Sequence, residues 1–247
     1  MTRKLVTDDT ALREELLRQL NTDDDNTQDI VLPQYRVQSG GAPGFINPTT
    51  GVSIPELEGV IIHVSHPRAL WASEEGGNQS PLCASLDGVR GAIGDDKLDA
   101  FIEFAASKEQ QDKIDPFQET GMACRTCPFN AFGSGKGKGK ACKETRRLLM
   151  LPKDSASGIP LVISLPPSSI RNWQAFYSSR KEKGLGYASC YVTLTTAKAM
   201  AGSNPYSIVA LRSGPELPIE VLQQVITLRD QYVASLARQM EADEVSE

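Results

Sequence analysis

The chain has 247 residues, 40% of them hydrophobic, and a formal net charge of −5. This hydrophobic content supports a buried core, and the length suits one elaborated domain or two small ones. No apolar run approaches the ~20 residues that a membrane-spanning helix needs, and the acidic balance argues against a surface that coats nucleic acid as a whole. We therefore expect a soluble, cytoplasmic protein with no membrane partner.

The N-terminal residues 1–28 predict a peripheral segment. Leucines recur at helical spacing over residues 10–20, which predicts a short amphipathic helix. Residues 21–29 are acidic and polar, as is typical of a linker. A single domain is expected to follow over residues 29–240.

The first half of that domain predicts two strands and a helix. Residues 29–37 and 59–64 have strand character, and residues 97–106 place apolar side chains on one helical face. Arg68 and Trp71 come just after the second strand. They are candidates for stacking on a nucleic-acid base, with burial of the tryptophan against the core as the alternative.

The second half predicts further strands and two helices. The strands are expected at residues 148–151, 160–165, 187–196 and 206–212. One helix begins near Ser168, which is placed to cap it. A longer helix over 217–240 precedes an acidic tail, 241–247, which is a candidate contact for replication or recombination proteins.

Residues 187–196 show the clearest alternation in the chain. One face is apolar and includes Cys190, while the other carries Tyr187 and Tyr191 two residues apart. If that second face is open, the tyrosines could stack successive bases, as in β-barrel proteins that bind single strands. The alternative is that they only stabilise the sheet by cross-strand pairing.

Four of the five cysteines predict a metal centre. Cys124 and Cys127 form a Cys-x2-Cys pair, Cys142 follows a Gly/Lys run, and Cys83 lies upstream. Four thiolates suit a structural Zn²⁺ with no open position for water. The alternatives are an iron–sulfur cluster or unpaired core thiols. In addition, His63 or His66 could take the place of Cys83 as the fourth ligand.

The segment 124–147, called the finger here, is strongly basic. Residues 121–147 contain one acid, Glu144, and seven cations that give a local charge of +6 and leave −11 for the rest: Arg125, Lys136, Lys138, Lys140, Lys143, Arg146 and Arg147. Its glycines are expected to leave backbone N–H groups unobstructed. With Phe129 and Phe132 among the charges, the finger is typical of a single-strand-binding surface. The alternative is a soluble hairpin tip that binds nothing.

These elements predict a mixed, β-rich α+β fold. We expect an OB-type barrel with a zinc-binding finger inserted at about residues 81–147 and a long C-terminal helix.

At the finger, the sequence resembles phage-encoded proteins that carry a CxxCPxNxFGS…GKGKACK block after a PxCxSxDG block. The resemblance covers about residues 58–212 and implies a phage origin, hence the host cytoplasm. The organisation is also similar to that of zinc-containing single-stranded-DNA-binding proteins of phages, although their histidine-containing ligand spacing is absent here.

Three functions are compatible with these features. The first is a non-enzymatic protein that binds single-stranded DNA in phage replication or recombination. The second is an adaptor that grips an acidic protein with the basic finger. The third is an iron–sulfur nuclease, which the acidic and lysine residues near the finger support poorly because they lie in helix-like or loop-like sequence.

Overall fold

The computed structural model describes residues 31–38, 40, 42–72, 80–110, 112, 114, 122–153 and 158–246, with side chains as far as residue 236. The chain divides into two compact units, Met1–Val31 and Leu32–Glu247. The helix and linker expected within residues 1–28 lie outside the described residues. The second unit contains the sheet and all of the cysteines.

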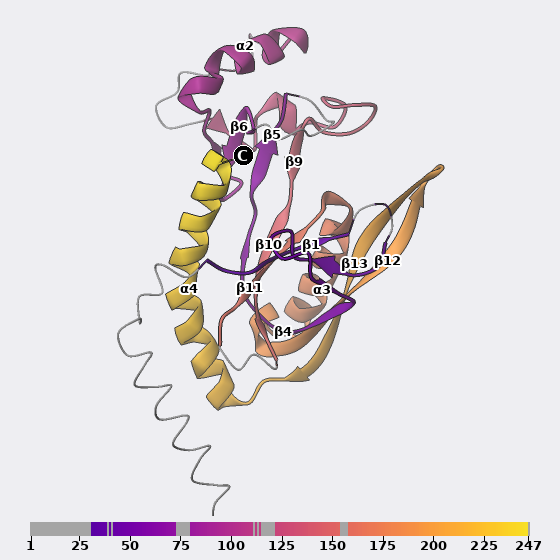
Figure 1. Cartoon of the computed structure of the whole chain (residues 1–247), viewed down its shortest axis with the longest axis vertical. Coiled ribbons are helices and arrows are strands. Elements are labelled where there is room, and N and C mark those ends of the chain that lie inside the picture. Colours follow the sequence, from indigo (N-terminus) through magenta and orange to yellow (C-terminus); the bar gives the residue numbers. More distant parts are fainter. Residues whose placement is uncertain are drawn as a thin grey trace, which may run out of the picture. The chain divides into compact units, whose positions relative to one another are not determined.

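Eight strands form one mixed sheet in the order β13-β12-β4-β10-β11-β1-β2-β3 (Figure 1). Their bounds are β1 Gln34–Val37, β2 Phe45–Ile46, β3 Ser53–Ile54, β4 Glu56–Ser65, β10 Arg146–Pro152, β11 Leu161–Leu165, β12 Cys190–Ala201 and β13 Asn204–Glu216. Neighbouring strands are antiparallel except β1 and β11, which are parallel. The expected strands at 59–64, 148–151 and 206–212 fall within these elements, and the one at 160–165 matches β11 except for Pro160.

The sheet curls so that its two ends approach one another. The Ser207 hydroxyl, on β13, donates a hydrogen bond to the carbonyl of Ala42, which lies between β1 and β2. The backbone N–H of Gly44 donates to the Thr196 hydroxyl of β12. The fold is therefore mixed α+β and sheet-rich with a curled sheet, whereas a five-stranded OB-type barrel is not confirmed.

Helix α3 (Ile170–Glu182) covers one face of the sheet. Its Trp173 and Phe176 join the main core, which also contains Phe45, Leu57, Ile61, Leu148, Met150, Ile163, Leu165, Cys190, Val192, Leu194 and Val209. Cys190 is fully buried there, as the alternation of its strand predicts.

The start of α3 is fixed by the edge strand of the sheet rather than by a cap. The Ser169 hydroxyl accepts a hydrogen bond from the Val209 N–H, and the Asn172 amide donates to the Val209 carbonyl. Ser168 donates to the Ser207 carbonyl and makes no cap bond, so its expected capping role is wrong. These side chains satisfy backbone groups on the free edge of β13.

Helix α4 (Ile219–Ser246) contacts β4 and confirms the long C-terminal helix. Among its side chains up to residue 236, the buried ones are Val225, Tyr232, Ser235 and Leu236. The helix continues through most of the segment 241–247 that was expected to form a separate tail.

A register shift in β4 decides which of its side chains face α4. Leu149 of β10 lies opposite His63 and Met150 opposite Ile61, so Ile62 is an extra, bulged residue. Ile61 and Val64 consequently both pack on the main core. The bulge therefore turns His63, two residues after Ile61, to the opposite face, which it would not reach in a regular strand.

The strand expected over 187–196 begins later than its pattern suggests. Residues Tyr187–Ser189 form a turn of 3-10 helix, and β12 starts at Cys190. A buried Arg180 holds this turn by donating to the Gly186 carbonyl, the Ser189 hydroxyl and both carboxylate oxygens of Glu216. The two-residue alternation therefore does not extend back to Tyr187.

Between β4 and β10 the chain builds a separate cysteine module, residues 68–144. Its central sheet has the order β6-β5-β9 (Cys83–Ser85, Arg68–Leu70 and Cys142–Glu144). A second ribbon pairs β7 (Arg90–Gly91) with β8 (Met122–Ala123), and α2 (Leu98–Ser107) packs beside them. Figure 1 shows β5 and β9 side by side, leading from the main sheet towards α2.

Candidate metal centre and nucleic-acid interface

The cysteine module has its own apolar core. The buried members are Leu70, Leu82, Phe101, Ala105, Met122, Phe129 and Ala141. Cys83, Cys127 and Cys142 are partly buried and pack against the same cluster. Three of the four predicted ligands therefore border one small core, although they come from distant positions in the sequence.

Strand register places two of these cysteines at the same level. In the β6-β5-β9 sheet, Leu70 lies opposite Cys83 on one side and opposite Cys142 on the other. Residues that are directly opposite in a sheet point to the same face. Cys83 and Cys142 therefore flank Leu70 on one face of the module's sheet.

A glycine on the β7–β8 ribbon lies against two of the thiols. A Cβ built on Gly91 would lie 2.7 Å from the Cys83 sulfur and 3.7 Å from the Cys124 sulfur. The ribbon is held at this point by the Cys124 N–H, which donates to the Val89 carbonyl. Gly91 thus forms a cradle in which Cys83 meets the Cys-x2-Cys turn, and a Cβ at this position would have to displace the Cys83 sulfur.

Cys127 and Cys142 are partly buried, and neighbouring thiols act on them electrostatically. Burial is the main cause that raises the pKa of Cys142 to about 11, and the neighbouring Cys127 and Cys124 add to it. Burial also raises the pKa of Cys127. Without a cation, these groups are neutral thiols at pH 7, whereas a bound Zn²⁺ would require thiolates.

The donor set suits a structural zinc ion, since the four predicted sulfur ligands come from three segments that lie around the module's core and Gly91. Among the described residues, however, no group of three or more His, Cys, Asp or Glu side chains is close enough to form a ready-made metal site. Zinc bound by Cys83, Cys124, Cys127 and Cys142 stays a prediction.

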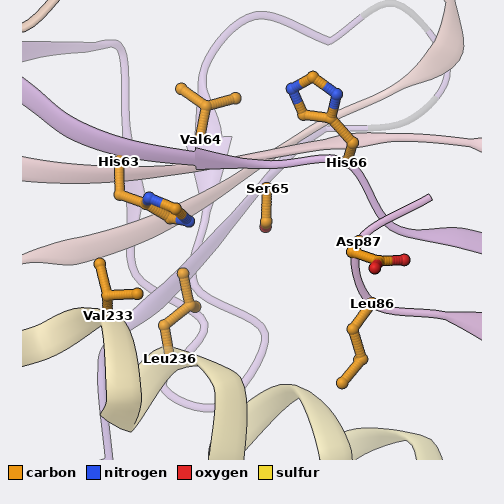
Figure 2. A pocket seen from close by; sticks show the side chains of 8 residues that line it. All are labelled: His63, Val64, Ser65, His66, Leu86, Asp87, Val233 and Leu236. Carbon is orange, nitrogen blue, oxygen red and sulfur yellow. The ribbon is translucent and has the colours of Figure 1, made fainter. Parts of the chain in front are cut away.

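His63 and His66 do not join the thiols. They line a pocket between β4, the turn after β6 and helix α4 (Figure 2). Burial lowers the pKa of both imidazoles, and Arg229 adds to this for His63 and Arg146 for His66. Neither histidine therefore replaces Cys83 in this structure.

The Gly/Lys loop of the finger is folded by its own hydrogen bonds. The N–H groups of Gly133 and Gly135 both donate to the Gly139 carbonyl, and the Ser134 hydroxyl donates to the Phe129 carbonyl. The expectation that the glycines leave their N–H groups unobstructed is wrong for these two. Gly137, with φ +61°, turns the chain at the tip.

A cationic and aromatic surface remains on this loop. Phe132 is 82% exposed, and the Lys140 ammonium lies 4.9 Å from its ring centre. Lys136, Lys138 and Arg125 are also exposed. We call these five residues the finger surface.

Asn130 links the finger surface to the Cys-x2-Cys turn, a role that the sequence did not reveal. Its amide nitrogen donates to the Cys124 carbonyl at 2.9 Å. Its oxygen accepts hydrogen bonds from Arg68 at 2.6 Å and Lys140 at 3.0 Å. This asparagine belongs to the CxxCPxN part of the block that carries the resemblance, but its partner Arg68 lies 62 residues away in the sequence.

Three expected nucleic-acid contacts are structural instead. Phe129 is fully buried and makes edge-to-face contacts with Phe101 and Phe104, so it cannot stack on a base. Arg68 and Arg146 are both paired with Glu144. The two arginines are held inside the module because their hydrogen-bonded ion pairs with Glu144 offset the cost of burying charge.

Other expected contacts keep partial exposure. Lys143 is half-buried, and its ammonium donates to the Lys140 carbonyl. Arg147 is half-buried on β10, opposite Ser65. Trp71 is half-buried just after β5. The positions of these three neither support nor oppose a role in binding.

The two tyrosines do not share an open face. Tyr187 packs on the main core, with ring-centre distances of 5.7 Å to Trp173 and 6.2 Å to Tyr177. Tyr191 lies on β12, where the Lys153 ammonium is 5.4 Å from its ring centre. The predicted pair of stacking platforms on the sheet is therefore wrong.

Comparisons with protein-family models, with curated proteins and with solved structures find no significant match. None of the described helices is long and apolar enough to cross a membrane.

Proposed function

We propose that this protein binds single-stranded DNA through the finger surface and serves phage replication or recombination. The observation that carries the proposal is Phe132, a large apolar ring that is 82% exposed on a folded loop and accompanied by Lys140. Exposed aromatic rings among cations suit single strands, because bases stack on the ring while lysines contact phosphates. The phage setting rests on the resemblance of the finger sequence.

The cysteine module positions this surface. In the proposal, Zn²⁺ joins Cys83 and Cys142 of the module's sheet to the Cys-x2-Cys turn, and supplies structural cross-linking only. Asn130 connects the Cys-x2-Cys turn to the finger surface, because it forms hydrogen bonds with both the Cys124 carbonyl and the Lys140 ammonium. Phe132 and Lys140 would then meet a strand in a fixed arrangement.

The main sheet serves as the body that carries the finger. An OB-type barrel would offer its sheet face as a stacking platform, but Tyr187 is partly buried and packs against the main core. The proposal therefore assigns stacking first to Phe132, with Trp71 and Tyr191 as lesser candidates. The acidic C-terminal residues 241–247 are proposed to contact replication or recombination proteins.

The test is fluorescence anisotropy of labelled single-stranded and duplex oligonucleotides at two salt concentrations, with zinc measured in the same sample. We expect single strands to bind more tightly, and affinity to fall steeply with salt because bound phosphates release counterions. Phe132→Ala should weaken binding by about 1–3 kcal/mol. Absence of single-strand binding at low salt would refute the proposal.

A second function, an adaptor that binds an acidic protein, gains support from the packing of Tyr187 against the main core. An adaptor needs the basic loop but no row of stacking platforms. The same titration separates the two functions: an adaptor would bind single strands and duplex DNA with equal, weak affinity. Phe132→Ala would then leave the oligonucleotide affinity unchanged.

A further inference from the structure

A pocket of about 410 Å³ lies between strand β4, the turn after β6 and helix α4 (Figure 2). Its walls include the aliphatic side chains of Leu86, Val233 and Leu236. Pockets for small ligands have volumes of roughly 300–1,000 Å³, so this one is at the lower end. A volume of this size accommodates one ring system with a sugar.

The β-bulge at Ile62 supplies the polar groups of this pocket. It turns His63 and Ser65 to the face of β4 that looks towards α4. Figure 2 shows both side chains directed from the strand towards Val233 and Leu236. Bulges often redirect side chains beside functional sites, and here the redirection brings two hydrogen-bonding groups to an apolar wall.

Asp87 adds a hydrogen-bond acceptor whose carboxylate is already held in place by its neighbours. One carboxylate oxygen, Oδ1, accepts hydrogen bonds from the N–H groups of Val89 at 2.7 Å and Arg90 at 3.3 Å and from the Ser85 hydroxyl at 3.1 Å. These bonds, the one from Val89 first, hold the pKa of Asp87 below its usual value. Within the described residues no hydrogen bond reaches the other oxygen, Oδ2, which leaves it available to an N–H donor.

The lining selects against anions. No lysine or arginine is among the described residues that line the pocket. Burial lowers the pKa of His63, so its imidazole is neutral at pH 7 and acts as a hydrogen-bonding group rather than a cation. A phosphate or carboxylate group would therefore meet the Asp87 carboxylate on the lining itself, whereas Arg229 and Arg146 act on the histidines from outside the lining.

We infer that the pocket binds a nucleobase with an exocyclic amino group, taken either from a free nucleoside or from one unstacked base of a bound strand. The aliphatic walls contact the faces of the ring, His63 and Ser65 bond its edge, and Asp87 accepts from the amino group. Carboxylates pair in this way with the amino group of cytosine. The choice of a nucleobase among neutral heterocycles rests on the proposed binding of single-stranded DNA.

The first arm of the test uses free nucleosides and isothermal titration calorimetry. Deoxycytidine and deoxyadenosine should bind more tightly than thymidine, which has no exocyclic amino group. Asp87→Asn keeps an oxygen for Val89, Arg90 and Ser85 but replaces the free acceptor with a donor. It should weaken deoxycytidine binding roughly ten- to hundredfold, as expected for a lost hydrogen bond to a charged group.

The second arm uses oligonucleotides of deoxycytidine and of thymidine with the full chain. Val233→Phe fills the pocket, and Ile226→Phe is the matched control because Ile226 is exposed elsewhere on α4. If the ligand is a base of the strand, Val233→Phe weakens binding of the deoxycytidine oligonucleotide and spares that of thymidine. If the ligand is a free nucleoside, only the first arm responds.

The inference is overturned if nucleosides do not bind and neither Asp87→Asn nor Val233→Phe changes the preference between the two oligonucleotides. This outcome is distinct from failure of the proposed function, which is decided by whether the unaltered protein binds single strands at all. Should Val233→Phe fail to fold, Asp87→Asn still decides the matter, since it preserves the bonds that shape the turn.

Discussion

Two phenylalanines three residues apart in the finger should behave in opposite ways when truncated. Phe129 is fully buried in the core of the cysteine module, whereas Phe132 is 82% exposed on the loop. Phe129→Ala should therefore reduce stability and Phe132→Ala should reduce binding. Each variant serves as the control for the other, since both remove the same side chain from the same segment.

The size of the first effect follows from burial and ring contacts. Truncating a buried Phe to Ala costs about 3–5 kcal/mol, part of it from the cavity that is left. Phe129 also loses edge-to-face contacts with Phe101 and Phe104, at ring-centre distances of 6.0 and 5.2 Å, each worth about 0.5–1.5 kcal/mol. We place the loss at the upper end of that range, or ~8–20 °C in melting temperature for a chain of this size.

The assays are urea unfolding for stability and oligonucleotide anisotropy for binding. Phe132→Ala should change stability by less than about 0.5 kcal/mol, as exposed positions do, and weaken single-strand binding by about 1–3 kcal/mol. Phe129→Leu keeps the burial and loses the ring contacts, which covers the case in which the alanine variant does not fold. Equal stability losses at the two positions would show that this assignment of core and surface is mistaken.

Three further substitutions test other parts of the structure. Gly91→Ala should lower the zinc content because its Cβ meets the Cys83 sulfur, while Gly186→Ala, whose Cβ would make only an ordinary contact with the Ala188 nitrogen at 4.0 Å, should not; metal analysis of both checks this. Lys138→Gln should reduce the slope of log affinity against log salt by about 0.7, measured by anisotropy; an unchanged slope would remove Lys138 from the interface. Hydrogen bonds from Arg180 lower the pKa of Glu216, so its stabilisation is present at neutral pH and lost as pH falls through that lowered pKa. Glu216→Gln should flatten the acid limb of a stability–pH curve, and an unaltered limb would contradict the role of the pair.

Elements with strong local periodicity could be predicted from the sequence. The stripe over residues 97–106 corresponds to α2, and the apolar runs near 59–64 and 160–165 lie in β4 and β11. These patterns reflect local burial on one or both faces of an element, which a single sequence carries directly.

Features that depend on distant partners could not be predicted. The start of β12 is displaced by Arg180, whose partner Glu216 is far along the chain. The bulge at Ile62 depends on the pairing of β4 with β10, and an uninterrupted apolar run gives no sign of it. Both features changed the predicted site. Tyr187 lies in the turn before β12 rather than on the sheet face, and His63 lies on the face of β4 that looks towards α4.

The candidate site likewise combines features that the local sequence predicts with features that depend on distant partners. The cysteine spacing and the basic composition of the finger are local properties, and they drew attention to the segment that the module presents. Which of two nearby phenylalanines is buried depends on α2, whose Phe101 and Phe104 cover Phe129 and leave Phe132 outside. Arg68 and Arg146 resemble surface cations in the sequence, but Glu144 lies between them in the fold.

Because the cysteine module has a core separate from the main core, a metal cross-link would matter to the stability of this module. The core of the cysteine module consists of a few side chains, and small cores supply little stability without a metal or disulfides. The thiols of Cys127 and Cys142 border that core, and burial raises the pKa of both, so zinc binding would convert neutral groups into cross-linking thiolates. Zinc removal should therefore loosen the module and the finger surface while leaving the main core intact. This makes single-strand affinity more sensitive to a chelator than overall secondary structure, and equal sensitivity of the two would contradict the two-core description.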